Sequence, residues 1–96
     1  MNDAVSDAVV RDVRIINQRG LHARASAKFV QVAGTFDATV EVEKDGVRVG
    51  GTSIMGLMML AASSGCFIRV IASGPQAAEA MAALEALVAD RFGEEI

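Results

Sequence analysis

The sequence predicts an α+β fold with three helices on one face of a four-stranded, mostly antiparallel sheet, in the order βαββαβα. Short β-rich segments alternate with helical patterns along the 96 residues, and such elements bury their apolar sides by packing in two layers. The length suits one domain, and the 52% hydrophobic content predicts a packed core. We divide the chain into an N-terminal extension, residues 1–8, that the core does not need, and a single domain, residues 9–96.

The first elements are a strand and a helix. Residues 9–16, VVRDVRII, are β-rich and partly alternating, which predicts a strand, and residues 17–20 read as a turn. From about Ala23 the pattern becomes helical, with apolar residues at Ala25, Phe29, Val32 and Ala33. We expect Gly34 to end this helix by adopting a left-handed conformation.

A hairpin is predicted next. Residues 36–43, FDATVEVE, alternate between apolar and polar side chains, as in a strand with one wet face. Asp45-Gly46 predicts a tight turn, and residues 47–49 form the returning strand.

The second half repeats the alternation of helix and strand. Ser53 is a good N-cap for a short helix in IMGLMMLAA, and residues 66–72, CFIRVIA, predict a strand. Gly74-Pro75 opens the last helix, whose buried stripe is Met81, Leu84, Val88 and Phe92. Cys66 is expected to be buried as a small hydrophobic residue.

Charge and composition exclude several classes of function. The net charge of −3 argues against nucleic acid as a partner, and no stretch is apolar for long enough to cross a membrane. The start of the chain is unlike a signal peptide, so a cytoplasmic protein is expected. One cysteine and one histidine argue against a metal cluster or an internal disulfide, and no cofactor is expected.

Basic residues gather where acidic ones are absent. Residues 13–36 contain Arg14, Arg19, Arg24 and Lys28 but no acid, and residues 46–78 contain Arg48 and Arg69 but no acid. This segregation fits either a solvated surface of uneven composition or a face prepared for anions or an acidic partner.

The only histidine, His22, lies where the predicted turn becomes a helix. Free amides and the helix dipole at such an end favour an anion, above all a phosphate. Neutral imidazole is a nucleophile, and Arg24 can offer a forked guanidinium to phosphoryl oxygens. The residues alone leave two interpretations open: phosphate chemistry at His22, or a histidine that merely caps the helix or is idle on the surface.

Two motifs resemble the histidine-containing phosphocarrier protein (HPr) family of the bacterial phosphoenolpyruvate-dependent phosphotransferase system. GLHAR precedes the first helix and SIMG begins the second, at the family's usual separation, and the likeness spans about residues 9–92. The resemblance implies an open-faced β-sandwich. It also implies a phosphoryl carrier, not an enzyme, in which His22 takes a phosphoryl group on Nδ1 from phospho-enzyme I and passes it to an IIA-type protein.

The resemblance assigns further residues. Arg24 matches the arginine that supports the phosphate, and Ser53 matches a serine that a dedicated serine kinase/phosphorylase modifies in many members. One position departs from the family, since Ala25 stands where proline is usual; this change loosens the helix start at most slightly. We expect a monomer that docks its partners through Ala23, Ala27, Ile54, Met55 and Met58.

Two other functions stay open. The chain fits a regulatory interaction protein of a nitrogen- or carbon-regulating phosphotransfer system, whose output is partner binding and not sugar transport. It also fits a small-ligand-binding module in which His22 is incidental.

Overall fold

The computed structural model describes residues 8–96, and its elements follow the predicted order. Ala8 is exposed ahead of the first strand, and the remainder of the predicted extension, residues 1–7, lies outside the described residues. The elements are β1 (Val9–Arg14), α1 (Ala23–Ala33), β2 (Thr39–Lys44), β3 (Val47–Gly50), α2 (Ile54–Met59), β4 (Phe67–Ser73), α3 (Ala77–Ala89) and a 3₁₀ turn, η2 (Arg91–Gly93). Two boundaries differ by three residues: β2 begins at Thr39 and not at Phe36, and α2 ends at Met59 and not at Ala62.

The strands form one sheet in the order β1-β4-β2-β3, and each neighbouring pair is antiparallel. Alternation along β2 and β4 explains which side is buried: Val40, Val42, Ile68, Val70 and Ala72 point into the core. The predicted Asp45-Gly46 turn is confirmed. Both residues have positive φ, 52° and 83°, as a two-residue hairpin turn requires.

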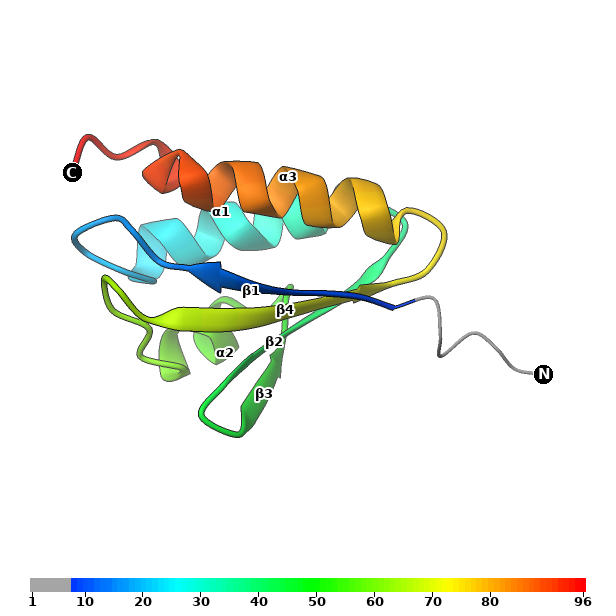
Figure 1. Ribbon diagram of the computed structural model, residues 1–96, viewed down its shortest axis with the longest axis horizontal. Coiled ribbons are helices and arrows are strands. Elements are labelled where there is room, and N and C mark those ends of the chain that lie inside the picture. Colours follow the sequence, from blue (N-terminus) through cyan, green and yellow to red (C-terminus); the bar gives the residue numbers. More distant parts are fainter. Residues whose placement is uncertain (1–7) are drawn as a thin grey trace.

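The helices cover one face of this sheet, as Figure 1 shows for α1 and α3. Helix α3 packs on β1 and β4, α1 packs between α3 and α2, and α2 also contacts β3. The predicted stripe of the last helix is buried, but its final member, Phe92, lies beyond α3 in η2. On α1, Val32 is only half-buried, and Ser26 takes a core position instead.

The end of α1 differs from the prediction. Gly34 has φ −73°, in the right-handed region, so no left-handed glycine closes the helix. Gly34 is nevertheless the C-cap residue, and Thr35 completes the helix end: its amide donates to the Val32 carbonyl at 3.1 Å, and its hydroxyl donates to the Gln31 carbonyl at 2.9 Å. These bonds satisfy carbonyl groups that lack helical partners at the end of a helix.

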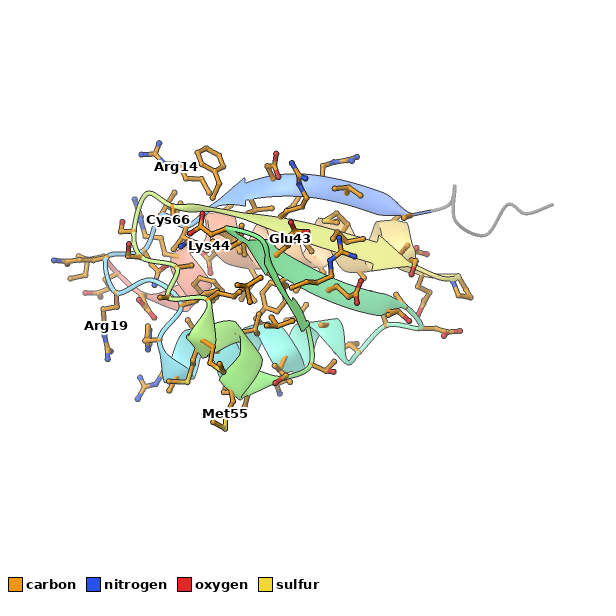
Figure 2. All side chains as sticks on the ribbon, turned by 90° about the horizontal axis from the view of Figure 1, so that it is seen from below. Arg14, Arg19, Glu43, Lys44, Met55 and Cys66 are labelled. Atoms are coloured by element: carbon orange, nitrogen blue, oxygen red, sulfur yellow. The ribbon has the colours of Figure 1, made fainter. Side chains whose placement is uncertain are left out.

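The other face of the sheet is open and carries a row of charged side chains (Figure 2). Asp12, Arg69, Glu43 and Arg48 lie in register across the four strands. Arg69 pairs with Asp12 and Arg48 with Glu43, each at 3.0 Å. These alternating negative and positive side chains keep the exposed face of the sheet hydrated, and no helix within the described residues covers that face.

Cys66 contradicts the prediction of a buried hydrophobic residue. It is half-buried and immediately precedes β4, and its Sγ lies 3.4 Å from the Ser63 hydroxyl. Hydrogen bonds with Ser63 hold the pKa of the Cys66 thiol below its usual value, and the Lys44 charge adds to this effect.

Within residues 8–96, no helix is both long enough and apolar enough to span a membrane.

Candidate functional site

His22 is carried by a loop that is pressed against a second loop. Gly20, at φ +68°, leaves no room for a side chain, because a Cβ would lie 2.5 Å from the Ala62 carbonyl oxygen. The next amide, that of Leu21, donates to the same carbonyl at 2.9 Å, and the Leu21 side chain is buried. The two residues that precede His22 are therefore both held in place against the second loop.

The start of α1 leaves its first amides free for a ligand. His22 is the N-cap residue with extended backbone, and its side chain makes no capping hydrogen bond. Its carbonyl accepts the first helical bond, from the Ser26 amide at 2.9 Å. The amides of residues 23–25 therefore have no helical acceptor. His22 therefore caps the helix through its backbone position and not through its side chain.

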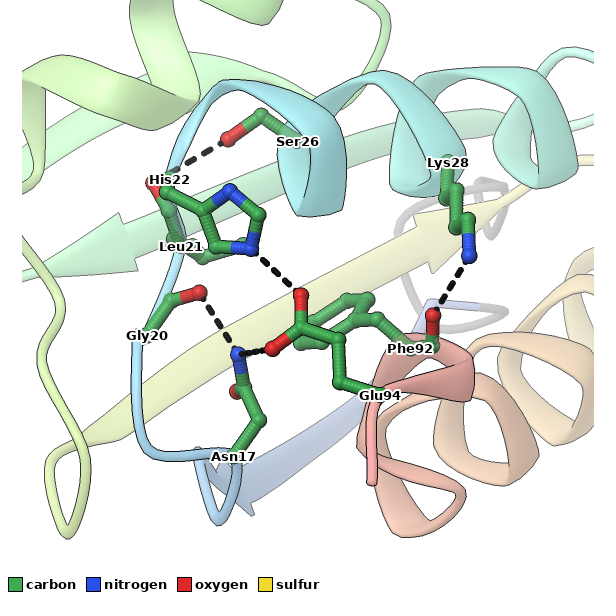
Figure 3. A network of polar contacts seen from close by, with 8 residues as sticks. All are labelled: Asn17, Gly20, Leu21, His22, Ser26, Lys28, Phe92 and Glu94. Carbon is green, nitrogen blue, oxygen red and sulfur yellow. Dashed lines mark hydrogen bonds and ion pairs between the residues drawn. The ribbon is translucent and has the colours of Figure 1, made fainter. Parts of the chain in front are cut away.

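A carboxylate from the other end of the chain contacts the histidine ring. Glu94 Oε2 is hydrogen-bonded to His22 Nε2, and both side chains are largely buried. Asn17 Nδ2 donates to Glu94 Oε1 at 3.0 Å and to the Gly20 carbonyl at 2.9 Å. Figure 3 shows this network, with the second ring nitrogen, Nδ1, pointing away from the carboxylate.

The electrostatics of Glu94 favour its ionised form. Burial raises the pKa of this carboxyl. The hydrogen bonds from His22 and Asn17, with the charges of His22 and Arg19, outweigh burial and lower the pKa below its ordinary value. A carboxylate that is ionised at neutral pH can only accept hydrogen bonds.

A short left-handed segment brings Glu94 to the site. Arg91, Phe92 and Gly93 all have positive φ, 56°, 54° and 79°, and the two that are not glycine each cost roughly 1–2 kcal/mol in this conformation. Phe92 is buried and anchors the turn, and Lys28 Nζ donates to its carbonyl at 2.7 Å. Beyond Glu94, the tail stays beside the site, because the Gln18 amide donates to the Ile96 carbonyl oxygen at 2.8 Å.

Arg24 and Ala25 occupy the first turn of α1 with different surroundings. Arg24 is exposed, and within residues 8–96 its side chain has no hydrogen-bond or ion-pair partner. A free guanidinium can reorient toward a phosphoryl group. Ala25 is fully buried, so its small side chain packs into the core.

Ser53 begins α2 and caps it as predicted. Its hydroxyl accepts the Gly56 amide at 3.0 Å. The residue is exposed, so the same oxygen that caps the helix is within reach of solvent.

Exposed apolar side chains of α2 form a surface that we call the methionine patch: Ile54, Met55, Met58 and Met59, which are 40%, 74%, 43% and 74% exposed. Met55 projects outward from α2 in Figure 2. Leu57 and Leu60 are buried and hold the helix to the core. On neighbouring α1, Ala23 is exposed and Ala27 half-buried. Met59 is not among the predicted docking residues, because helical spacing alone does not show which side a short apolar helix buries.

Asn17 and Glu94 were also missed from the sequence. The sequence pattern predicts Asn17 only as part of a turn, and Glu94 follows the last predicted helix with no pattern around it. The only available signal was the polar Asn17 immediately after an apolar run, which does not reveal a partner so distant in the chain.

The chain is similar to known phosphocarrier proteins over most of its length. A family model described as "PTS HPr component phosphorylation site" matches residues 9–90. The phosphocarrier protein HPr of Cupriavidus necator is 54% identical over 84 residues, which cover 88% of this chain and 94% of that protein. The HPr of Neisseria meningitidis is 52% identical over the same shares.

A solved structure shows the same architecture. The crystal structure of HPr-C-His from Thermoanaerobacter tengcongensis has a TM-score of 0.87 and 42% sequence identity, and the match covers 92% of this chain and 99% of that one. The fold predicted from the sequence is thereby confirmed. The chain belongs to the HPr family of the bacterial phosphotransferase system.

Proposed function

We propose that this protein carries a phosphoryl group on His22, taking it from phospho-enzyme I and giving it to an IIA-type protein. One observation supports this function above the others: the imidazole stands at the start of α1 beside amides without helical acceptors. That position can accommodate the negative charge of a phosphoryl group once it is attached to the ring.

The transfer step uses Nδ1, the ring nitrogen that Glu94 does not engage. Its lone pair attacks the phosphorus of the phosphorylated donor; the bond between phosphorus and Nδ1 forms as the bond to the donor's leaving atom breaks. The amides of residues 23–25 and the guanidinium of Arg24 bind the phosphoryl oxygens. The reverse sequence of bond changes delivers the group to the acceptor.

Partner docking is assigned to the methionine patch together with Ala23 and Ala27. Helices α1 and α2 are in contact, so this apolar surface and the histidine belong to adjoining elements. Methionine side chains adapt to differently shaped partners, as a protein that binds both a donor and an acceptor requires.

Ser53 is the proposed regulatory phosphorylation site. A phosphoryl group on its exposed hydroxyl would add about −1.5 to −2 charges at the edge of the methionine patch. Negative charge is compatible with a helix start, so the fold stays intact while an acidic partner is repelled. Ser53→Asp should therefore slow transfer from enzyme I without unfolding the protein; unchanged transfer would refute this role.

The carrier function is tested by intact mass spectrometry after incubation with enzyme I and phosphoenolpyruvate. We expect one acid-labile phosphoryl group on the wild type and none on His22→Ala. Failure of the folded wild type to gain the group from an active enzyme I would overturn the proposal. Presenting the phosphorylated protein with a sugar-specific and a regulatory IIA protein then separates transport from regulation.

A further inference from the structure

We propose that Glu94 is a positioning residue for His22: its carboxylate keeps the ring proton on Nε2, so that Nδ1 presents its lone pair to the incoming phosphorus. This inference deepens the proposed function, and only its expected effect on the rate of phosphoryl transfer rests on that function. The tautomer it assigns is a property of the unphosphorylated protein.

The contact itself determines the direction of the hydrogen bond. Glu94 Oε2 meets Nε2, and an ionised carboxylate has no hydrogen to donate. The proton between the two groups therefore belongs to Nε2, and a neutral ring has only one N–H. The lowered pKa of Glu94 keeps the carboxylate ionised at neutral pH.

The carboxylate is in turn oriented by Asn17. This side chain is fully buried and divides its amide hydrogens between Glu94 Oε1 and the Gly20 carbonyl. Its own Oδ1 is buried without a hydrogen-bond partner in the described part of the chain, although an unpaired buried oxygen is unfavourable. The orientation of the Asn17 side chain is therefore determined by its two donated hydrogen bonds and not by its oxygen.

The path of the backbone is consistent with a role in the site. The segment from Arg91 to Gly93 adopts three consecutive positive φ angles, although only one of its residues is glycine. Strained backbone of this kind persists where the surrounding structure requires it and is typical of functional sites. Its result here is to turn the chain out of α3 and place Glu94 against His22 (Figure 3).

Glu94 also suits the phosphorylated state. When phosphorus is bound to Nδ1 and the proton stays on Nε2, the ring carries positive charge, and the carboxylate is its counter-charge. The same hydrogen bond is thus present in the unphosphorylated and the phosphorylated protein, and the ring does not need to turn during transfer. A carboxylate or carbonyl on the second ring nitrogen is a general way to set histidine tautomer and orientation.

The matched pair Glu94→Gln and Glu95→Gln tests this assignment. Both remove one carboxylate from neighbouring positions, but Glu95 is exposed. In Glu94→Gln, Asn17 continues to donate to the side-chain oxygen, which turns the new NH₂ toward His22. That NH₂ donates to Nε2 and moves the ring proton to Nδ1, the nitrogen that must attack.

The first measurement is the tautomer, read by ¹⁵N–¹H correlation spectra of ¹⁵N-histidine-labelled protein at a pH where the ring is neutral. We expect the Nε2–H form in the wild type and Glu95→Gln, and mainly the Nδ1–H form in Glu94→Gln. Glu94→Ala, which can neither donate nor accept, should give a mixture. A wild-type tautomer in Glu94→Gln would overturn the proposal.

The second measurement is the rate of phosphoryl transfer from enzyme I, with urea unfolding as a check on the fold. We expect Glu94→Gln to be slower than the wild type by about 10-fold or more and slower than Glu94→Ala, because glutamine holds the wrong tautomer. Equal rates for the Gln and Ala variants would overturn the role in transfer. If Glu94→Gln shifts the tautomer but the wild type takes no phosphoryl group from an active enzyme I, the carrier function is overturned and the positioning contact alone is supported.

Discussion

Gly20 packs against the backbone of Ala62 so closely that residue 20 has no space for a Cβ. Gly20→Ala must therefore shift one of the two loops and also place alanine at φ +68°. We expect the free energy of unfolding to fall by about 2–4 kcal/mol, measured by urea denaturation. Gly46→Ala is the control, since it has φ +83° but open space around its Cβ, and should cost only about 1 kcal/mol. Equal losses would show that the contact with Ala62 is unimportant.

The N-cap at Ser53 predicts a difference between two substitutions. Ser53→Ala removes the acceptor for the Gly56 amide and should lower the free energy of unfolding by about 1 kcal/mol. Aspartate is an equally good cap, so Ser53→Asp should keep the wild-type stability. Thermal unfolding of both variants checks this. If Ser53→Asp is as unstable as Ser53→Ala, slowed transfer in the Asp variant can no longer be attributed to charge alone.

Substitutions on helix α2 should distinguish a residue that packs in the core from a residue that contacts a partner. Leu57 is completely buried and Met59 is 74% exposed. Leu57→Ala should therefore lower the free energy of unfolding by about 2–5 kcal/mol, while Met59→Ala changes it by less than about 0.5 kcal/mol. In titration calorimetry with enzyme I, Met59→Ala should weaken binding. Unaltered affinity for this variant would remove Met59 from the docking surface.

Arg24 should matter for transfer and not for folding. Because its side chain is exposed and free of partners among the described residues, Arg24→Ala leaves the native contacts intact. Loss of a charge-assisted hydrogen bond to the transferred group, about 1.5–3 kcal/mol, corresponds to roughly 10–100-fold slower transfer. Rapid-quench kinetics measure the rate, and Arg14→Ala, an exposed arginine on β1, is the control for net charge. A similar slowing in both variants would indicate long-range charge and not phosphate contact.

The lowered pKa of Glu94 predicts a pH dependence of stability. A carboxyl with a lower pKa in the folded protein than in the unfolded chain stabilises the fold above its ordinary pKa, here 4.5, and loses this contribution as the pH falls through the lowered value. The wild type should thus be more stable than Glu94→Gln at neutral pH, with the difference shrinking below about pH 4.5. Urea denaturation of both proteins at a series of pH values measures it. A difference that is constant with pH would contradict the hydrogen bonding of Glu94 as an ionised carboxylate.

Much of this molecule could be predicted because its signals are local. The alternation in β2, the Asp45-Gly46 turn and the Ser53 cap each depend on residues a few positions apart. His22 was found because glycine, histidine and arginine stand together at a helix start. The contact between His22 and Glu94 could not be found in the same way. It depends on the left-handed path of Arg91 and Phe92, residue types that rarely adopt that conformation, and on the docking of α3 against the sheet.

The position of the C-terminal tail also has a practical meaning for experiments. The tail ends beside the loop that carries His22, at the opposite end of the molecule from the start of β1 (Figure 1). A purification tag joined after Ile96 would extend from the edge of the proposed phosphoryl-transfer site, so a tag ahead of β1 interferes less with assays. For the same reason, a small fluorophore attached at position 96, whose side chain is 66% exposed, would report the arrival of a partner at His22.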